Sequence, residues 1–172
     1  LIARHVDKGS MAYLLAAPVK RITVVFTQLM VLLTGIVILV GFATVLGIVA
    51  SHMQFPNELD INAFLMINLG TLALHLFIAG ICFLSSCLFN DTSLSIGVGA
   101  GIPAISYVIQ MVANLEGKFD PAKYLTFFTF FDTKAIIAKE SYGYLGIVIL
   151  LIGAFILFFT SIRVFINKDL HI

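Results

Sequence analysis

The stretch Ile22–Ala50, ITVVFTQLMVLLTGIVILVGFATVLGIVA, contains 29 consecutive residues without a charged side chain. It follows directly on the basic pair Lys20 and Arg21. As an α-helix it would be about 43 Å long at about 1.5 Å per residue, whereas the hydrocarbon core of a bilayer is about 30 Å thick. The stretch therefore predicts a membrane-spanning helix, and the function of the chain has to be sought in a bilayer.

The composition of the whole chain agrees with this environment. Of its 172 residues, 60% are hydrophobic and only 11% are charged, with a mean hydropathy of +1.09. Soluble domains carry about 25% charged residues. The net charge of +1 and the lack of a basic stripe with interleaved aromatic residues argue against binding of nucleic acid. The chain begins with Leu1 rather than Met, and its first apolar stretch is too long for the core of a secretory signal. We therefore expect a chain that has lost an N-terminal part.

Three further apolar segments are predicted to span the membrane, at about residues 61–89, 94–112 and 144–166. They are expected to be helices, because a segment in lipid has to satisfy its own backbone hydrogen bonds. Asp91 or Thr92 is expected to cap the helix of 94–112. The sequence thus predicts an all-α integral membrane protein with about four transmembrane helices in this chain.

The basic residues predict its orientation in the membrane. With four spans, both ends of the chain lie on one side, and that side has six basic residues against four on the other. The six are Arg4, Lys8, Lys20, Arg21, Arg163 and Lys168, and the four are Lys118, Lys123, Lys134 and Lys139. Because cytoplasmic segments carry the excess of Lys and Arg, we expect a multi-pass protein of the cell membrane with both ends in the cytoplasm.

The segment before the first span, residues 1–21, reads LIARHVDKGSMAYLLAAPVKR. Met11, Leu14 and Leu15 share one face of a helix, which is typical of an amphipathic element at the cytoplasmic interface. From these residues alone, a plain membrane-surface anchor is one interpretation and a docking element for a partner is another.

Two motifs carry a resemblance to a known family. Asp7–Met11, followed by Leu14-Leu15 and by Pro18–Arg21, resembles the cytoplasmic signature of ABC-2 type permeases, the membrane subunits of ATP-binding cassette (ABC) exporters. Phe165–Leu170 is similar to the closing pattern of that family, an aromatic residue, a basic residue and Asp-Leu. The family has six spans, which implies that the first helix is absent from this chain. His5 stands where the family has Glu, which implies an altered or pH-dependent partner contact.

The resemblance implies a role for residues 1–21 as a coupling segment that docks on a separate ABC ATPase subunit, while residues 22–172 form the permease domain. The residues implied in docking are Asp7, Gly9, Met11, Leu14, Leu15 and Pro18. ATP and Mg would bind to the ATPase subunit, since this chain has no Walker A motif, and we expect neither a cofactor nor an enzyme activity in it. A second permease subunit, identical or different, would complete the translocation path.

The link between the last two spans is rich in aromatic residues. Asp120-Pro121 predicts the start of one short helix and Asp132-Thr133 the start of a second, within about residues 120–140. Neither is long enough to span, so the segment is expected at the membrane interface or as a shallow re-entrant piece. It is either an interface anchor or an external gate over the path, formed by Tyr124, Phe127, Phe128 and Phe131.

Polar residues within the spans are the candidates for the translocation path: Gln28, Asn68, His75 and Gln110. His75 lies near the middle of its span, where an ionisable side chain is a functional candidate. The alternative is a hydrogen bond from a neutral imidazole to another helix. Gly97–Gly101, before Pro103, predicts close helix packing and a kink. Cys82 and Cys87 are predicted to be buried as small hydrophobic residues rather than paired or bound to metal.

Together these observations favour the permease subunit of an ABC exporter that moves an amphipathic or apolar substrate, such as a peptide, a drug or a lipid. A non-transporting membrane scaffold or an immunity-type membrane protein is the alternative. Membrane lipid is an expected partner in either case.

Overall fold

The computed structural model describes residues 2, 21–56, 58–114 and 124–168. Within these ranges the chain is helical and has no strand. The elements are α3 (Arg21–Gln54), α4 (Ile61–Leu88), α5 (Thr92–Ala113), the 3-10 helix η2 (Phe127–Phe130), α6 (Thr133–Ile137) and α7 (Ser141–Asn167). Of these, the 4 helices α3, α4, α5 and α7 are long and apolar enough to cross a membrane, as predicted.

Aspartate side chains mark where three of the helices begin. The carboxylate of Asp91 accepts hydrogen bonds from the backbone N–H groups of Ser93 and Leu94, at 2.6 and 3.1 Å, so α5 begins slightly earlier than the sequence suggested. Asp60 caps α4 and Asp132 caps α6 in the same way. Such caps satisfy N–H groups that have no partner within the helix. The expected helix start at Asp120-Pro121 lies outside the described residues.

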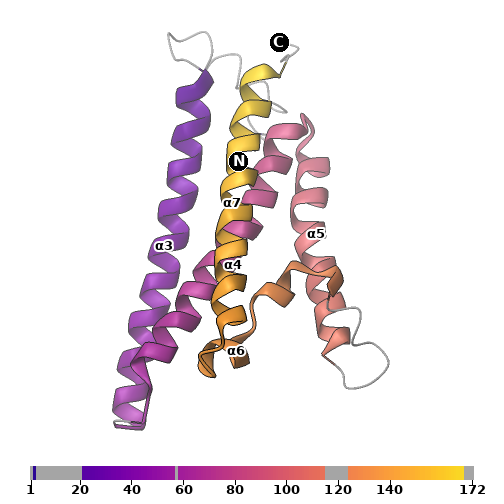
Figure 1. Cartoon of the computed structure of the whole chain (residues 1–172). Coiled ribbons are helices and arrows are strands. Elements are labelled where there is room, and N and C mark those ends of the chain that lie inside the picture. The colour runs from indigo at the N-terminus through magenta and orange to yellow at the C-terminus, as the bar shows by residue number, and fades with distance from the viewer. Residues whose placement is uncertain (1, 3–20, 57, 115–123, 169–172) are drawn as a thin grey trace.

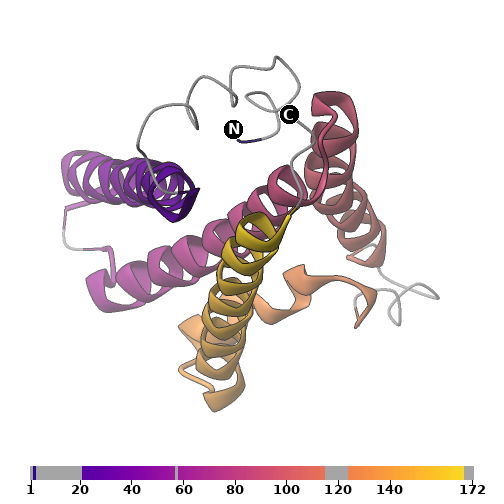
Figure 2. The same cartoon turned by 90° about the horizontal axis from the view of Figure 1, so that it is seen from above.

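The centre of the molecule is the crossing of α4 and α7 (Figure 1). α4 runs obliquely behind α7, and this pair shares the most extensive contact between any two elements. α3 and α5 stand on either side of α4, well apart from each other in both views (Figure 2). The other three long helices, α3, α5 and α7, therefore lie splayed around α4 and do not form a closed bundle with it.

Glycines allow α4 and α7 to approach closely. A Cβ atom added to Gly80 of α4 would lie 2.9 Å from Cβ of Leu157 in α7. One added to Gly153 of α7 would lie 2.6 Å from the ring of Phe77 in α4. Small residues at such crossings gain van der Waals contact, which drives association in lipid because burial of apolar surface there gains little.

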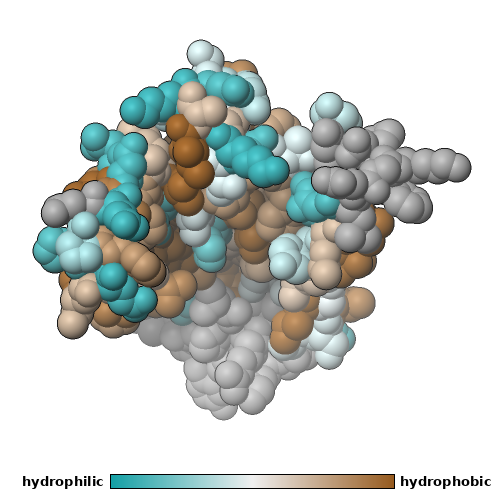
Figure 3. Space-filling view, turned by 90° about the horizontal axis from the view of Figure 1, so that it is seen from below, coloured by the Kyte–Doolittle hydropathy of each residue, from teal (hydrophilic) through white to brown (hydrophobic). Residues whose placement is uncertain are grey.

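The flanking helices are much less covered than the central one. In the most apolar part of α3 and of α5, 11% of the residues are buried inside the chain, against 44% in α4. Exposed apolar side chains run along both helices, which suits contact with lipid or with another membrane protein. Seen from the end where the α3–α4 hairpin and α6 lie, hydrophilic side chains gather near the rim and hydrophobic surface lies between and below them (Figure 3).

Candidate functional site

A concave site lies beside the C-terminal half of α4, where α3 and α5 also border it. It is a cavity of about 200 Å³ that we call the α4 groove. Residues of three helices line it: Leu32 of α3, Cys82, Phe83 and Ser86 of α4, and Ser95, Ile96, Gly99 and Ala100 of α5. The floor is therefore α4, and the walls are the two sparsely covered helices.

His75 lies on the same face of α4, two helical turns before Cys82. Phe77 of α4 packs towards α7 and is about 200° away from His75 around the helix axis. The imidazole of His75 therefore faces away from α7. Both His75 and Cys82 are exposed. The prediction that Cys82 is buried is wrong, since its side chain borders the α4 groove; Cys87 is buried as predicted, and neither thiol forms a disulfide.

The imidazole of His75 bonds to its own helix. Its Nδ1 lies 2.8 Å from the backbone oxygen of Thr71. A carbonyl oxygen accepts only, so Nδ1 carries the proton, and in the neutral ring Nε2 is then an acceptor. The hydrogen bond to another helix that the sequence suggested is replaced by this bond within α4. In the neutral ring, Nε2 of His75 is thereby an acceptor atom on an exposed side chain near the middle of α4.

Two other predicted path residues share this side of the molecule. Gln28 lies one turn before Leu32, which lines the groove, and is partly buried. Asn68 lies two turns before His75 on the same face of α4, partly buried, and its amide donates to the carbonyl oxygen of Phe64 at 2.8 Å. The structure thus brings Gln28, Asn68 and His75 to one side of α4.

The upper part of the groove is held together by bonds between α4 and α5. The Cys82 thiol donates to the Gly99 carbonyl oxygen at 3.1 Å, and the Ser85 hydroxyl donates to that of Ser95 at 2.8 Å. A Cβ on Gly99 would lie 3.3 Å from the Cys82 backbone, so the predicted close packing of the glycine-rich stretch is present here. At Gly97 and Gly101 no atom of the described residues lies within 4 Å of an added Cβ, so the predicted close packing is not present at those two positions.

Gln110 does not lie with the other three path residues. Its side-chain oxygen accepts hydrogen bonds from the hydroxyl groups of Thr126 and Thr129, the latter at 3.5 Å. Its amide donates to the side chain of Asn114 at 3.2 Å. Gln110 therefore fastens the segment around η2 to the end of α5, a structural role that its position in a span did not reveal.

Aromatic rings continue this attachment across the molecule. Phe128 lies edge-to-face on Tyr107 of α5 at 5.7 Å between ring centroids, and stacks on Phe127 at 4.6 Å. Phe127 in turn lies 5.1 Å from Phe77 of α4. Of the predicted gate residues, Phe127, Phe128 and Phe131 are partly buried, whereas Tyr124 is 76% exposed.

Glycines of α7 and α4 make room for this segment. A Cβ on Gly146 would lie 2.1 Å from the backbone oxygen of Phe130, and one on Gly143 would lie 2.9 Å from the backbone nitrogen of Ile136. Phe131 occupies the space beside Gly70 of α4. The segment is thus packed among α4, α5 and α7.

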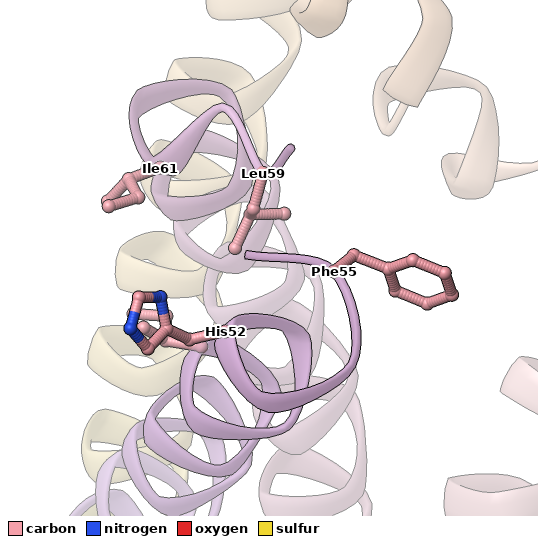
Figure 4. Close-up of a pocket in the computed structure, with 5 residues that line it drawn as sticks. His52, Phe55, Leu59 and Ile61 are labelled. Atoms are coloured by element: carbon pink, nitrogen blue, oxygen red, sulfur yellow. The ribbon is translucent and has the colours of Figure 1, made fainter. Parts of the chain in front are cut away.

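A second hollow of about 230 Å³ lies at the tip of the α3–α4 hairpin, lined by Ile48, His52, Phe55, Leu59 and Ile61 (Figure 4). In the close-up, the Phe55 ring points away from the other labelled side chains. Its polar group, His52, is exposed, and the charged residues Glu58 and Asp60 of the same hairpin are exposed as well. Only α3, α4 and the turn between them line this hollow, whereas three helices line the α4 groove, so the α4 groove is the stronger candidate.

At the end of the molecule opposite the α3–α4 hairpin, a lysine side chain joins the end of α7 to the end of α4. Lys168 Nζ donates to the carbonyl oxygens of Cys87 and Leu88, at 3.0 and 2.8 Å, and so satisfies the C-terminal end of α4. Partial burial lowers the pKa of Lys168 from its usual value. Ile2 is buried nearby against Val25 and Phe83, whereas the predicted docking residues Asp7, Gly9, Met11, Leu14, Leu15 and Pro18 lie outside the described residues.

Residues for metal chemistry do not come together in the part of the chain that the structure describes, where no group of three or more His, Cys, Asp or Glu could hold an ion. Comparison with known proteins adds no assignment: no protein-family model, curated protein or solved structure matches the chain.

Proposed function

We propose that this chain is the membrane subunit of an ABC exporter, which moves an amphipathic or apolar substrate out of the cell. ATP and Mg bind to a separate ATPase subunit, and a second permease subunit, identical or different, completes the path. Both ends of the chain face the cytoplasm. The basis is the resemblance of residues 7–21 and 165–170 to ABC-2 permeases.

One structural observation carries the proposal furthest. The α4 groove has polar groups along an otherwise apolar face, with His75 and Cys82 exposed, and α3, α4 and α5 contain no Asp, Glu or Lys and no Arg beyond Arg21 at the start of α3. Charged cargo would cross such a surface at a high cost, since nothing neutralises its charge. An uncharged or amphipathic cargo fits it.

The sparse cover of α3 and α5 supports a role with partner subunits. Both helices contact their neighbours along one side and leave most of their apolar residues outward. Residues 1–21 lead directly into α3, which is less buried within the chain than α4. A tilt of α3, driven by the ATPase through this segment, would widen or narrow the α4 groove as a rigid-body motion.

The experiment that tests the proposal targets the docking residues. In Leu14→Ala with Leu15→Ala, we expect normal membrane insertion but loss of the ATPase subunit on purification, because buried aliphatic anchors dominate interface energy and cost about 1–3 kcal/mol each when truncated. The matched control is Val37→Ala with Ile38→Ala, which removes comparable apolar groups from exposed positions of α3, 52% and 64% exposed.

The control variant should retain the ATPase subunit. Equal yields of ATPase with both double variants would leave the N-terminal segment as a membrane anchor. A wild-type chain that purifies without any ATPase would contradict the exporter and favour the scaffold.

A further inference from the structure

We propose that the outer face of α7 binds an anionic phospholipid, whose headgroup phosphate bonds to Arg163 and whose acyl chain lies against apolar side chains of the preceding turns. This surface, which we call the α7 lipid face, consists of Ile152, Phe155, Ile156, Phe159 and Arg163. The inference goes beyond the proposed function and does not rest on it, because it concerns how the chain contacts its bilayer and not what crosses it.

The length of α7 places Arg163 at the depth of the lipid headgroups. Residues 141–162 contain no Asp, Glu, Lys or Arg and belong to one continuous helix. That stretch is about 33 Å long, close to the thickness of about 30 Å of a hydrocarbon core. Arg163 is the first charged residue after it. The helix therefore brings the guanidinium to the boundary between acyl chains and headgroups, where the phosphates lie.

The side chain of Arg163 points away from the core of the molecule. Phe158 and Phe165 are buried on α7, and Phe158 lies edge-to-face on Phe83 of α4, with 6.1 Å between the ring centroids. At 3.6 residues per turn, Arg163 is about 140° from Phe158 and about 160° from Phe165 around the helix axis. Arg163 is also exposed. It therefore projects from α7 on the side opposite α4.

The positive charge of Arg163 has no carboxylate partner among the residues that the structure describes. Its guanidinium instead contacts the ring of Phe159, with Cζ 5.1 Å from the ring centroid. The carboxylate of Asp91, at the same end of the molecule, caps α5. A cation at the edge of the hydrocarbon requires a counter-charge, and the planar guanidinium has five N–H donors that match the oxygens of a phosphate.

The apolar part of the face distinguishes a phospholipid from a free anion. Phe155 and Phe159 are 73% and 52% exposed and lie about two turns and one turn before Arg163 on the same side of α7. A phosphate at Arg163 thus lies at the end of an apolar strip that runs towards the middle of the membrane. A phosphate ion would leave this strip unused, whereas a phospholipid presents a phosphate and an acyl chain at the matching depths.

Fluorescence quenching by brominated lipids tests the inference, because the chain has no tryptophan and a single introduced one is a specific reporter. In Phe155→Trp the reporter is about 12 Å from Arg163 along the helix axis, the depth of bromine atoms placed at the middle of an acyl chain. The full chain is reconstituted into discs of phosphatidylcholine and phosphatidylglycerol, with one lipid or the other brominated. We expect the relative affinity for phosphatidylglycerol, whose phosphate has no choline beside it, to be about fivefold.

Further variants separate the site from a general attraction of anionic lipid. Ile105→Trp is the matched reporter, since Ile105 is 63% exposed on α5 and lies about as far as Phe155 from this end of the molecule. It should report equal affinities for the two lipids. Adding Arg163→Gln to Phe155→Trp should abolish the preference for phosphatidylglycerol. Adding Arg163→Lys should retain part of it, because the charge stays and the planar set of donors is lost.

Equal affinities for the two lipids in Phe155→Trp, or a preference that survives Arg163→Gln, would overturn the inference. So would the same preference in Ile105→Trp. A reporter at Phe155 that neither lipid quenches would also overturn it, because a second copy of the chain or another protein would then cover this face. None of these results bears on the ATPase experiment, so failure of the lipid site and failure of the proposed function are distinguishable.

Discussion

Helices α5 and α7 each contain three glycines, yet the surroundings of these glycines differ. In α7, a Cβ at Gly143, Gly146 or Gly153 would meet atoms of a neighbouring element within 3 Å. In α5, a Cβ at Gly99 would meet Cys82 and Ser85 of α4, whereas at Gly97 and Gly101 it would meet no atom of the described residues within 4 Å. The same residue type marks a tight crossing in one helix and an uncovered face in the other, so composition alone does not identify a packed helix in a membrane.

The largest effect is expected where backbone meets backbone. Gly146→Ala places a Cβ 2.1 Å from the carbonyl oxygen of Phe130, which cannot rotate away as a side chain can. We expect a loss of about 3 kcal/mol in the free energy of unfolding, or displacement of η2 from α7. Unfolding of the purified protein in mixed micelles measures it, with Gly101→Ala as the control. Equal stability of the two variants would mean that η2 does not pack against α7.

The next largest effect on stability is expected among the aromatic rings of the segment around η2, which packs beside the glycines of α7. Phe127→Ala removes a ring that lies between Phe77 and Phe128, and we expect a loss of about 2 kcal/mol, since the ring is only partly buried. Tyr124→Ala is the matched control in the same segment, and we expect a change within about 0.5 kcal/mol because its side chain is 76% exposed. Both are measured by the same unfolding assay. A larger loss in Tyr124→Ala would show that a partner covers the outer end of the segment.

A smaller effect is expected at the attachment of this segment to α5. Gln110→Leu removes the acceptor shared by Thr126 and Thr129, and we expect a loss of about 1 kcal/mol. A cysteine placed at Thr129 should also react faster with a thiol reagent in this variant. Asn114→Ala is the control, since it removes only the bond from the amide of Gln110. An unchanged reaction rate at Thr129 would show that the aromatic rings alone hold η2.

The smallest effect is expected on the open face of α5. Gly97→Ala and Gly101→Ala should leave the stability of the isolated chain unchanged or raise it by up to about 1 kcal/mol, because Ala favours the helix and meets no neighbour. Thermal unfolding of the purified chain measures this. If the same changes abolish assembly in the membrane while the isolated chain is stable, a partner helix covers this face. A destabilised isolated chain would instead place a neighbour where the structure has none.

Several features of the fold follow from local sequence. The long runs without charged residues predict the four spans because their length matches a bilayer, and Asp91 and Asp132 predict helix starts because a short carboxylate reaches nearby N–H groups. These signals depend only on neighbours in sequence. The surroundings of the candidate site residues are less predictable: the hydrogen bonds that Gln110 accepts from Thr126 and Thr129, which fasten the segment around η2, do not follow from its position in a span.

The exposure of Cys82 and the surroundings of Gln110 could not be predicted from sequence for one physical reason. Whether Cys82 is buried or exposed, and whether Gln110 faces a path or a threonine hydroxyl, depends on which helix stands beside it, and in lipid apolar side chains are equally suited to both faces.

The sequence by itself determined that the chain is helical, that four of its segments are long and apolar enough to cross a membrane, and approximately where these helices begin and end, because such features follow from hydrophobic length and from capping. Only the tertiary structure decided which face of α4 packs against α7. That choice depends on glycines and rings that meet across the chain, such as Gly153 with Phe77, and no local pattern specifies such pairs.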